Sequence, residues 1–380
     1  MLSSILSSKS SCNIPQQTLE ILRLIRSENV GNKTFFELIK IFGTAKEAIK
    51  HVEEMSLRGG RNKPIKLYSN DQAIKELKKA SAMGVQMITY CDTSYPALLK
   101  QVIDYPPLIS VLGRSELLNT PAVAVVGARN CSVAGYEFAK KLAQDISQAG
   151  VTVVSGFARG IDTAAHNACL DTATIAVLAG GIDHIYPQEN SALYHKIAKQ
   201  GAIVAELPIG ASPSGQHFPQ RNRIISGLSL ATVVIEASLG SGSLITARLA
   251  LEQGREVFAV PGFPSDPRYK GNNKLIKDGA MIVESAQDVL NNLPNFELKK
   301  VCSVQEELPF YDMATNSAAI NDNMRKQITN MLSNTPVDTN LLIKHSKLPI
   351  NIVQLVLLEL ELAGKLLRHP GNKVSILQVY

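Results

Sequence analysis

The stretch AVAVVGARNCSVAGYEFAKKLAQDISQAGVTVVSGFARGID, residues 122–162, decides the fold. It holds two apolar, β-branched runs, 122–127 and 151–156, with a helix-like segment at 134–149 between them. Continuous apolar runs are typical of strands buried on both faces of a sheet. A strand, a helix and a second strand in this order give parallel strands joined by a crossover. The stretch therefore predicts a doubly wound, mainly parallel α/β sheet.

The same alternation continues to about residue 285. Further apolar runs predict strands at 174–180, 202–206, 232–237, 257–262 and 281–285. Helical patterns between the runs predict helices at 160–171, 189–200, 221–229 and 243–253. Repetition of this unit indicates an extended Rossmann-like domain.

The two flanks of this region have a different pattern. Residues 15–83 show apolar residues at three-four spacing, which is typical of short helices, and the Gly-centred turn VGNKT joins two of them. That turn could present backbone N–H groups to a phosphate or serve as an ordinary helix–helix turn. Residues 298–320 lose periodicity, and the segment after them shows three helical patterns and a hairpin, as in a winged helix. We expect a helical domain at 1–85, the sheet domain at 86–297, a linker at 298–320 and a winged helix at 321–380.

Composition narrows the class of protein. Of the 380 residues 45% are apolar, and no run approaches the roughly 18 apolar residues that span a bilayer. The first residues include no apolar stretch long enough for a signal peptide. The five cysteines are scattered without a C-x-x-C pair, which argues against a disulfide framework or a zinc site. We expect a cytoplasmic protein without a membrane segment.

Positive charge gathers at the ends of the chain. Residues 1–85 carry 14 Lys and Arg against 8 acidic residues, whereas residues 86–297 carry 16 against 18. A net charge of +6 allows a polyanionic partner but does not require one. The central region has no overall excess of positive charge, so any cluster of arginines there must arise from the local arrangement of these residues.

The loops that follow the predicted strands supply such a cluster. In a parallel sheet, ligands bind beyond the carboxyl ends of the strands. Glycine and serine in these loops let backbone approach a ligand, and helix N-termini offer unpaired N–H groups. Arginine adds a bidentate donor for phosphate. The residues concerned are Gly127, Arg129, Ser155, Gly156, Arg159, Gly160, Phe218, Arg221, Asn222, Arg223, Ser241 and Gly242.

Several of these side chains also have ordinary structural interpretations. Asp162, at a predicted helix start, could cap that helix or pair with an arginine. Arg223 could pair with Glu206 or Glu236, and Phe218 could belong to the core or stack on a base. His166 and His217 are more typical of core or supporting residues than of catalytic ones.

Familiar catalytic motifs are missing. The sequence has no G-x-x-x-x-G-K-[ST] loop, and its first post-strand loop is GARNCS rather than G-x-G-x-x-G. It has no G-x-S-x-G elbow, no H-E-x-x-H and no evident carboxylate pair. We therefore expect no catalytic residue, metal or cofactor, and the phosphate-cradling loops predict a binding protein.

Six motifs, in this order, resemble the DNA-processing protein A (DprA/Smf) family. They are VAVVGAR, SGFARGIDTAAH, VLAGGIDHIYP, FPQRNRIISGLS, SGSLITARLALEQGREVFAVPG and GNNKLIKDGA. The resemblance covers residues 86–290. Residues 15–83 resemble, less closely, that family's N-terminal helical domain of helix-hairpin-helix (SAM-like) type. Residues 321–380 resemble its C-terminal winged-helix domain.

The resemblance implies a recombination mediator that is not an enzyme. Such a protein binds and protects single-stranded DNA during natural transformation, loads the RecA recombinase and works as a dimer. The residues that the motifs carry over to the DNA pocket are Arg129, Ser155, Arg159, Gly160, Arg221, Asn222, Arg223, Ser241 and Gly242. The segment GASPSGQ before His217 is short of basic residues, which predicts fewer phosphate contacts.

Two other functions stay open at this point. A nucleoside-monophosphate phosphoribohydrolase of the LOG type has a related fold but needs a P-G-G-x-G-T-x-x-E motif, where this chain has SLGSGSLITARLALEQ. A nucleotide-sensing protein would take one small phosphate ligand. The spread of arginines over several loops favours a longer ligand.

The predicted winged helix has an unusual recognition segment. PINIVQLVLLELELAG, residues 349–364, carries Glu359 and Glu361 but no Lys or Arg. Helices that enter the major groove bring basic residues. We therefore predict that this helix does not read duplex DNA, and that the domain contacts protein or uses only its basic hairpin Arg368–Lys373.

Overall fold

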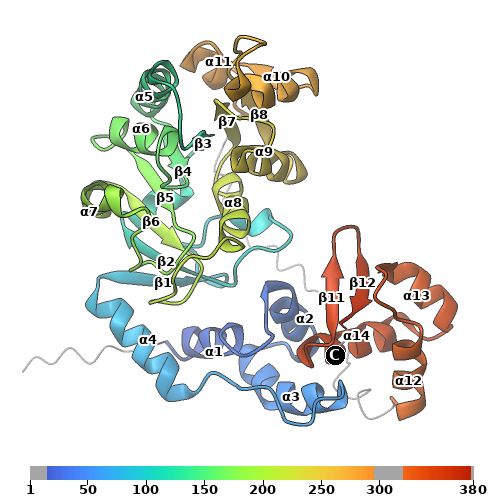
Figure 1. Cartoon of the computed structure of the whole chain (residues 1–380). Coiled ribbons are helices and arrows are strands. Elements are labelled where there is room, and N and C mark those ends of the chain that lie inside the picture. Colours follow the sequence, from blue (N-terminus) through green and yellow to red (C-terminus); the bar gives the residue numbers. More distant parts are fainter. Residues whose placement is uncertain (1–14, 295–319, 378–380) are drawn as a thin grey trace, which may run out of the picture. The chain divides into compact units, whose positions relative to one another are not determined.

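A computed structural model describes residues 15–294 and 320–377. The chain divides into two compact units, one made of Met1–Lys78 with Ser303–Tyr380 and the other of Lys79–Cys302. The second unit is built on a nine-stranded sheet in the order β1-β2-β6-β5-β4-β3-β7-β8-β9 (Figure 1). The strands are β1 Val85–Thr89, β2 Leu108–Gly113, β3 Ala122–Gly127, β4 Thr152–Ser155, β5 Thr174–Val177, β6 Ala202–Ala205, β7 Ala231–Ile235, β8 Glu256–Ala259 and β9 Met281–Ile282.

Seven strands of the sheet, from β6 to β9 in spatial order, are parallel, as the sequence predicts. The helices of this unit connect them. They are α5 Val133–Gln148, α6 Ile161–Ala168, α7 Ser191–Gln200, α8 His217–Gly227, α9 Gly242–Glu252, α10 Lys270–Lys277 and α11 Ala286–Leu290, with 3-10 turns η1 Leu99–Gln101, η2 Ser115–Asn119, η3 Gln188–Asn190 and η4 Pro267–Tyr269. The helix α4 Asn70–Ala82 spans the division between the units.

Alternate residues of the central strand β3 enter two different cores, because successive side chains of a strand point to opposite faces. Val123 and Val125 pack with α5 and α6. Ala124 and Val126 pack with α8 and α9. Helices therefore cover both faces, and the strand residues between them are apolar throughout, as the sequence of β3 requires.

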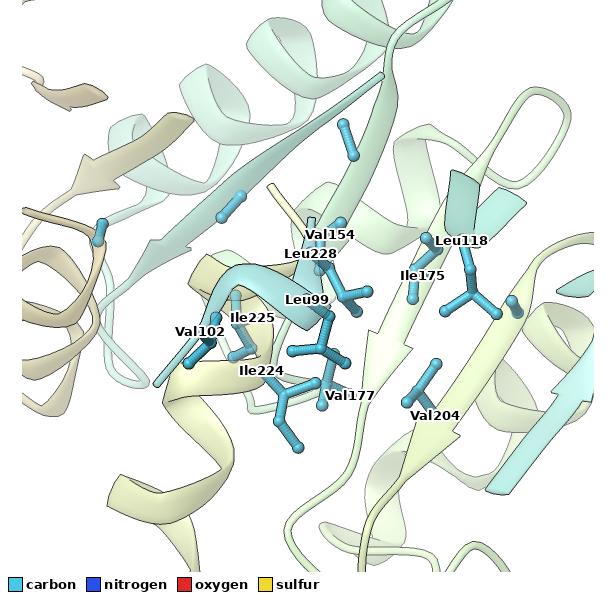
Figure 2. Packing of buried hydrophobic residues seen from close by; sticks show 14 of the residues in the cluster. Leu99, Val102, Leu118, Val154, Ile175, Val177, Val204, Ile224, Ile225 and Leu228 are labelled. Atoms are coloured by element: carbon cyan, nitrogen blue, oxygen red, sulfur yellow. The ribbon is translucent and has the colours of Figure 1, made fainter. Parts of the chain in front are cut away.

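The core beneath α8 fixes the loop that precedes it. Ile224, Ile225 and Leu228 pack against Leu99 and Val102 from the η1 region (Figure 2). The close approach is possible because Gly227 has no side chain. A Cβ atom there would lie 2.8 Å from Val102 Cγ2 and 2.9 Å from Leu99 Cδ1.

The other unit is helical, with one small sheet. Its N-terminal part comprises α1 Gln16–Ile25, α2 Asn32–Phe42 and α3 Ala45–Arg58. Its C-terminal part comprises three helices and an antiparallel sheet of order β10-β12-β11, which is a winged helix. These elements are α12 Asp322–Asn330, β10 Val337–Asp338, α13 Thr339–Ser346, α14 Ile350–Leu362, β11 Leu366–His369 and β12 Lys373–Ile376.

The sequence prediction missed the antiparallel edge of the large sheet. Strands β1 and β2 pair with each other and add to β6 in antiparallel register. They were not predicted because each lies outside the strand–helix alternation that marked the others. The strands from β4 onward are also shorter than their apolar runs, because the runs continue into post-strand loops that are themselves buried. The division expected at residues 85, 297 and 320 stays a prediction, and most of the linker at 298–320 lies outside the described residues.

Gly227→Ala is expected to destabilise the protein by about 1–3 kcal/mol, because the new methyl group overpacks Leu99 and Val102. Elsewhere in a helix the same change would normally stabilise. Gly215→Ala is the matched control, since nothing lies within 4 Å of a Cβ there. Urea unfolding followed by circular dichroism measures both variants. Equal stability of the two variants would contradict the packing argument.

Candidate functional site

The topology of the sheet locates a crevice. Strand β3 lies between β4, which follows it in the chain, and β7, which follows much later. Helices therefore leave β3 and β7 toward opposite faces, and the carboxyl ends of these strands flank an opening. Two neighbouring cavities lie at this edge, of about 220 and 510 Å³.

The two cavities share one wall. Its residues are Arg129, Asn130, Ala158, Phe218 and Arg221. The smaller cavity is completed by Gly156, Arg159, Leu178, Ala179, Gly180, His184, Tyr186, Pro187 and Pro213. The larger is completed by residues from β3, α6, α8, α9 and η4, which include Gly127, Asn222, Ser241, Gly242 and Arg268.

The shared wall carries a cation beside an aromatic ring. The Arg129 guanidinium lies 5.0 Å from the centre of the Phe218 ring, within range of a cation–π interaction. Tyr186 meets the same ring edge to face, with ring centres 5.8 Å apart. Phe218 is thus a cavity residue and not part of the core. A base stacked on this group would have a cation within reach of its phosphate.

Arg221 is almost fully buried, at 7% exposure, and is held by the ends of two strands. Its Nη1 donates to the carbonyls of Gly156 and Val177, and its Nε donates to Asn222 Oδ1 at 3.2 Å. Burial lowers the pKa of Arg221 to about 10, so the group stays charged at neutral pH. It therefore gives both cavities a fixed positive charge.

Asp162 is the anionic neighbour of Arg221. Burial raises the pKa of Asp162, while the charge of Arg221 and hydrogen bonds to the carboxylate oppose that rise. The carboxylate accepts from the backbone N–H groups of Gly156 and Ala158, both at 3.1 Å. Asp162 thus holds the 156–160 loop and neighbours Arg221. It lies in the first turn of α6 and does not cap that helix, whose N-cap is Gly160, so the arginine interpretation is the one observed.

The helix N-termini at this edge differ in what faces them. At α5, the carboxylate of Glu236 accepts from the backbone N–H of Ser132 at 2.8 Å, from the Ser132 hydroxyl and from Tyr269 Oη at 3.1 Å. At α6, Asp162 in the first turn of the helix accepts from the backbone of the preceding loop. At α9, only the neutral hydroxyl of Ser241 accepts from Ser243, at 3.3 Å. Of these three helices, α9 is the one whose N-terminus is capped by a neutral hydroxyl alone.

Glu236 sits in the place where doubly wound nucleotide-binding folds hold a phosphate, at the first helix after the first parallel strand. It is fully buried and has a φ of 51°, a left-handed conformation that is strained for glutamate. Gly135 permits its approach, since a Cβ there would lie 2.4 Å from Glu236 Oε1. An internal carboxylate thus closes the usual dinucleotide phosphate site.

Three of the sequence-predicted residues line neither cavity. The side chain of Arg223 is 8% exposed and forms ion pairs with Glu206 at 2.5 Å and with Asp104 at 3.2 Å. The structure therefore shows the ion pair with Glu206 that was one of its two interpretations. The Ser155 hydroxyl is buried and donates to Val125 O at 2.6 Å. Gly160 precedes α6 with a φ of 72°, and a Cβ there would meet Ala128 O at 2.3 Å. These three residues shape the loops from behind, and the binding role predicted for them stays a prediction.

The nine remaining predicted residues do line the cavities. They are Gly127, Arg129, Gly156, Arg159, Phe218, Arg221, Asn222, Ser241 and Gly242. Their proximity is a property of the structure, whereas their role in binding stays a prediction. Arg159 is exposed and forms an ion pair with Glu189 at 2.9 Å, so an incoming phosphate would compete with that carboxylate.

Sequence reasoning missed Asn130 and Arg268. Asn130 directly follows Arg129, and Arg268 follows strand β8, so the rule that selects post-strand loops could have found both. Sequence reasoning also considered Glu236 only as one of two alternative partners for Arg223. Tyr269, which also donates to Glu236, has no signal in the sequence.

His166 is a core residue and not a catalytic one. Its Nδ1 lies 2.7 Å from Thr174 Oγ1, and its ring is fully buried beside Phe157. Burial and, to a lesser degree, the charge of Arg221 lower the pKa of His166 to about 3, so the ring is neutral in the folded protein. His217 accepts from the Ser214 N–H at 3.1 Å and supports the turn before α8.

Two features are absent from residues 15–294 and 320–377, a metal-binding cluster and a membrane-spanning helix. No group of three or more His, Cys, Asp or Glu side chains in these ranges is arranged to hold a metal ion. No helix in them has both the length and the apolar character needed to cross a bilayer.

Comparison with protein families divides the chain into three matched segments. Residues 86–294 match the DNA recombination-mediator protein A family, 15–79 match a DprA-like N-terminal HHH domain, and 313–372 match the DprA winged-helix domain. The mainly parallel α/β sheet, the helical N-terminal domain and the winged helix are thus confirmed as the fold class.

Individual relatives agree with this assignment. Protein Smf of Escherichia coli is 40% identical over 290 residues, 74% of this chain and 75% of that protein. DNA processing protein DprA of Bacillus subtilis is 43% identical over 214 residues, 56% of this chain and 72% of that protein. An X-ray structure of DNA processing protein A from Streptococcus pneumoniae superposes with a TM-score of 0.63 at 33% identity, covering 75% of this chain and all of that one. DNA processing protein A from Helicobacter pylori, whose structure describes a single-stranded DNA binding mode, gives a TM-score of 0.52 at 29% identity, covering 56% and 97%.

Glu236→Ala is expected to destabilise the protein by about 2–4 kcal/mol, because it removes the acceptor of three hydrogen bonds, from the Ser132 N–H, the Ser132 hydroxyl and the Tyr269 hydroxyl. Urea unfolding provides the measurement. Ser241→Ala, which removes a neutral cap at the exposed start of α9, is the control and is expected to cost about 1 kcal/mol or less. A smaller loss for Glu236→Ala than for the control would refute this account of α5.

Folding stability is expected to fall with acid because of His166. Its pKa in the folded protein lies below the value in the unfolded chain, so the unfolded chain takes up the proton first as pH falls. The stability that neutral His166 contributes to the folded protein is fully present above about pH 6.5 and is lost progressively as the pH falls toward 3. Between pH 7 and pH 5 the wild type should lose about 2 kcal/mol more than His166→Gln in urea unfolding. His217→Gln, the control, should follow the wild type, and parallel pH profiles for all three proteins would contradict the assignment.

Proposed function

This chain belongs to the DNA recombination-mediator protein A family, and we propose that it works as a recombination mediator by binding single-stranded DNA across its two joined cavities. The observation that carries the proposal is the wall of Arg129, Phe218 and Arg221 that both cavities share. It combines two cations with an aromatic face at a sheet edge where parallel folds bind ligands.

A strand fits this arrangement better than a single nucleotide. Arg159 lies on the side of the smaller cavity, and Arg268 with the start of α9 lies on the side of the larger one. Phosphate-binding groups thus occur on both sides of Phe218, and one mononucleotide has phosphate at only one end. The internal carboxylate Glu236 further disfavours a dinucleotide held in the manner of a dehydrogenase.

Unpaired bases are needed to use the aromatic groups. Tyr186 is 48% exposed, and Phe218 lies beside it. A base can stack there only after it has left the duplex stack, and such stacking contributes roughly 1–3 kcal/mol per base. The site should therefore prefer single strands and tolerate any sequence, because every base has a stacking face.

We propose that the site binds and does not catalyse. The buried titratable groups beside it have partners inside the protein. Asp162, which lines the larger cavity, accepts from two backbone N–H groups, and His166 contacts Thr174 in the core. The alternative of a phosphoribohydrolase has no observation that favours it.

Three further parts of the proposal rest on family membership. The chain delivers bound strands to the RecA recombinase, acts as a homodimer and works in the cytoplasm, as the resemblance of its motifs implies.

Arg129→Ala and Phe218→Ala should weaken the binding of a fluorescent oligo-dT of about 35 nucleotides in different ways. Arg129 neutralises a phosphate, so its loss should lower affinity about tenfold and reduce the salt slope of log K by about 0.7. Phe218 stacks, so its loss should lower affinity five- to fifty-fold, within the roughly 1–3 kcal/mol of one base, and leave the salt slope nearly unchanged. Anisotropy across a salt series measures both effects.

Arg248→Ala is the matched control for Arg129→Ala. Arg248 is 69% exposed on α9, forms an ion pair with Glu252 and lines neither cavity, so its loss should leave both affinity and salt slope close to wild type. Wild-type binding by both test variants, or equal losses in all three proteins, would overturn the proposed site. Full competition by thymidine monophosphate at micromolar concentration would instead assign the cavities to a small ligand.

A further inference from the structure

The helix α14 occupies the recognition position of the winged helix, as the third helix before the hairpin of β11 and β12. A helix that enters a DNA groove presents a polar, basic face to solvent. Here eight of the 13 residues of α14 are buried: Val353, Leu355, Val356, Leu357, Leu358, Glu359, Leu360 and Leu362. Burial on this scale means that the helix is covered on more than one side.

The acidic residues of α14 are held inside the winged helix. Glu359 is 1% exposed, and its carboxylate accepts from Arg325 Nε at 2.8 Å and from Arg325 Nη2 at 3.1 Å. Glu361 accepts from Arg368 Nε at 2.8 Å. The basic hairpin residue Arg368 is thus engaged by a carboxylate of the recognition helix, which leaves less positive charge for a phosphate.

The outer side of α14 lies against helix α3 of the N-terminal helical domain, within the same compact unit. Backbone at the end of α3 approaches so closely that a Cβ on Gly59 would lie 2.0 Å from Glu359 O and 2.8 Å from Ala363 Cβ. Beside it, Lys365 Nζ donates to Gly60 O at 2.6 Å. Close packing and a charge-assisted hydrogen bond together join the end of α3 to the end of α14.

The turn between α1 and α2 completes the contact. Asn29 Nδ2 donates to Leu362 O at 3.0 Å, which satisfies one of the carbonyls that the end of a helix leaves unpaired. Asn29 precedes the Gly31 turn that the sequence marked as able to face a phosphate. Lys33, in the first turn of α2, has its pKa lowered by burial and by Arg368, so it also lies near the hairpin.

We propose that α14 is a docking helix whose partner is the helical domain of the same chain, residues 15–78, and that the two domains form one rigid module that reads no duplex DNA. The proposal does not depend on the single-stranded DNA site, which lies in the other unit. It assigns to the winged helix a function of holding the helical domain and its Gly-centred turn in place.

Gly59→Ala tests the docking directly. Gly59 has φ −69° and ψ 0°, which alanine adopts without strain, so the new methyl group clashes only with α14. In full-length protein, hydrogen–deuterium exchange at the C-terminal half of α14 and at the end of α3 should rise about tenfold. Gly31→Ala is the matched control in the same domain, because nothing lies within 4 Å of a Cβ there, and its exchange should equal that of the wild type.

Binding of a fluorescent 30-base-pair duplex provides the second readout. We expect the full-length wild type and Gly59→Ala to bind it equally weakly, because exposing an acidic helix adds no duplex site. Unchanged exchange in Gly59→Ala would overturn the docking, and a tenfold gain in duplex affinity would show that α14 is a masked reader instead. If circular dichroism shows that Gly59→Ala is unfolded, the double variant Asn29→Ala, Lys365→Ala replaces it, because it removes the two polar contacts. This variant should raise hydrogen–deuterium exchange at the same segments at least threefold. Unchanged exchange in the double variant would overturn the proposal.

Discussion

The buried guanidinium of Arg221 is the interaction on which the site depends. A charge taken out of water must find hydrogen-bond partners in the protein, because an unpaired buried charge is very costly. Arg221 meets this need with carbonyls at the ends of β4 and β5 and with the charge of Asp162 on α6. Two strands and two helices are thereby joined at one point, and the cavity edge becomes rigid before any ligand arrives.

Carboxylates of the protein itself decide which helix N-termini of the sheet domain remain available to a ligand. Glu236 closes the N-terminus of α5, and Asp162 closes the loop before α6. An outside anion is left with α9, Arg129 and the shared wall. The fold of a dinucleotide-binding protein is thus kept while its usual phosphate position is filled from within, and the two joined cavities lie beside that position on the same sheet edge. The strained backbone at Glu236 fits that role, since strain persists where many contacts hold a residue in place.

Positive charge and binding geometry are separated in this chain. The ends of the sequence hold the net excess of Lys and Arg, but in the helical unit several of these charges are used internally: Arg325 and Arg368 pair with the acids of α14, and Lys365 bonds the end of α3. In the near-neutral sheet domain, four arginines converge on two joined cavities. Local placement therefore matters more than net charge for where a polyanion is expected to bind.

The sequence by itself determined the parallel sheet, the order of its strands and helices and the loops that carry the site, because β-branched runs, helical periodicity and glycine positions are local properties of the chain. Nine of the twelve predicted site residues line the cavities for that reason. Only the tertiary structure showed that Arg221 and Arg223, which lie two residues apart on one helix, have different surroundings. The first reaches the cavities, and the second turns to Glu206 and Asp104, which are distant in sequence. Strands β1 and β2, the carboxylate of Glu236 at α5 and the covering of α14 were likewise decided by long-range contacts. Which partner a buried charge or an apolar helix face finds depends on what the fold brings beside it, and no local pattern records that.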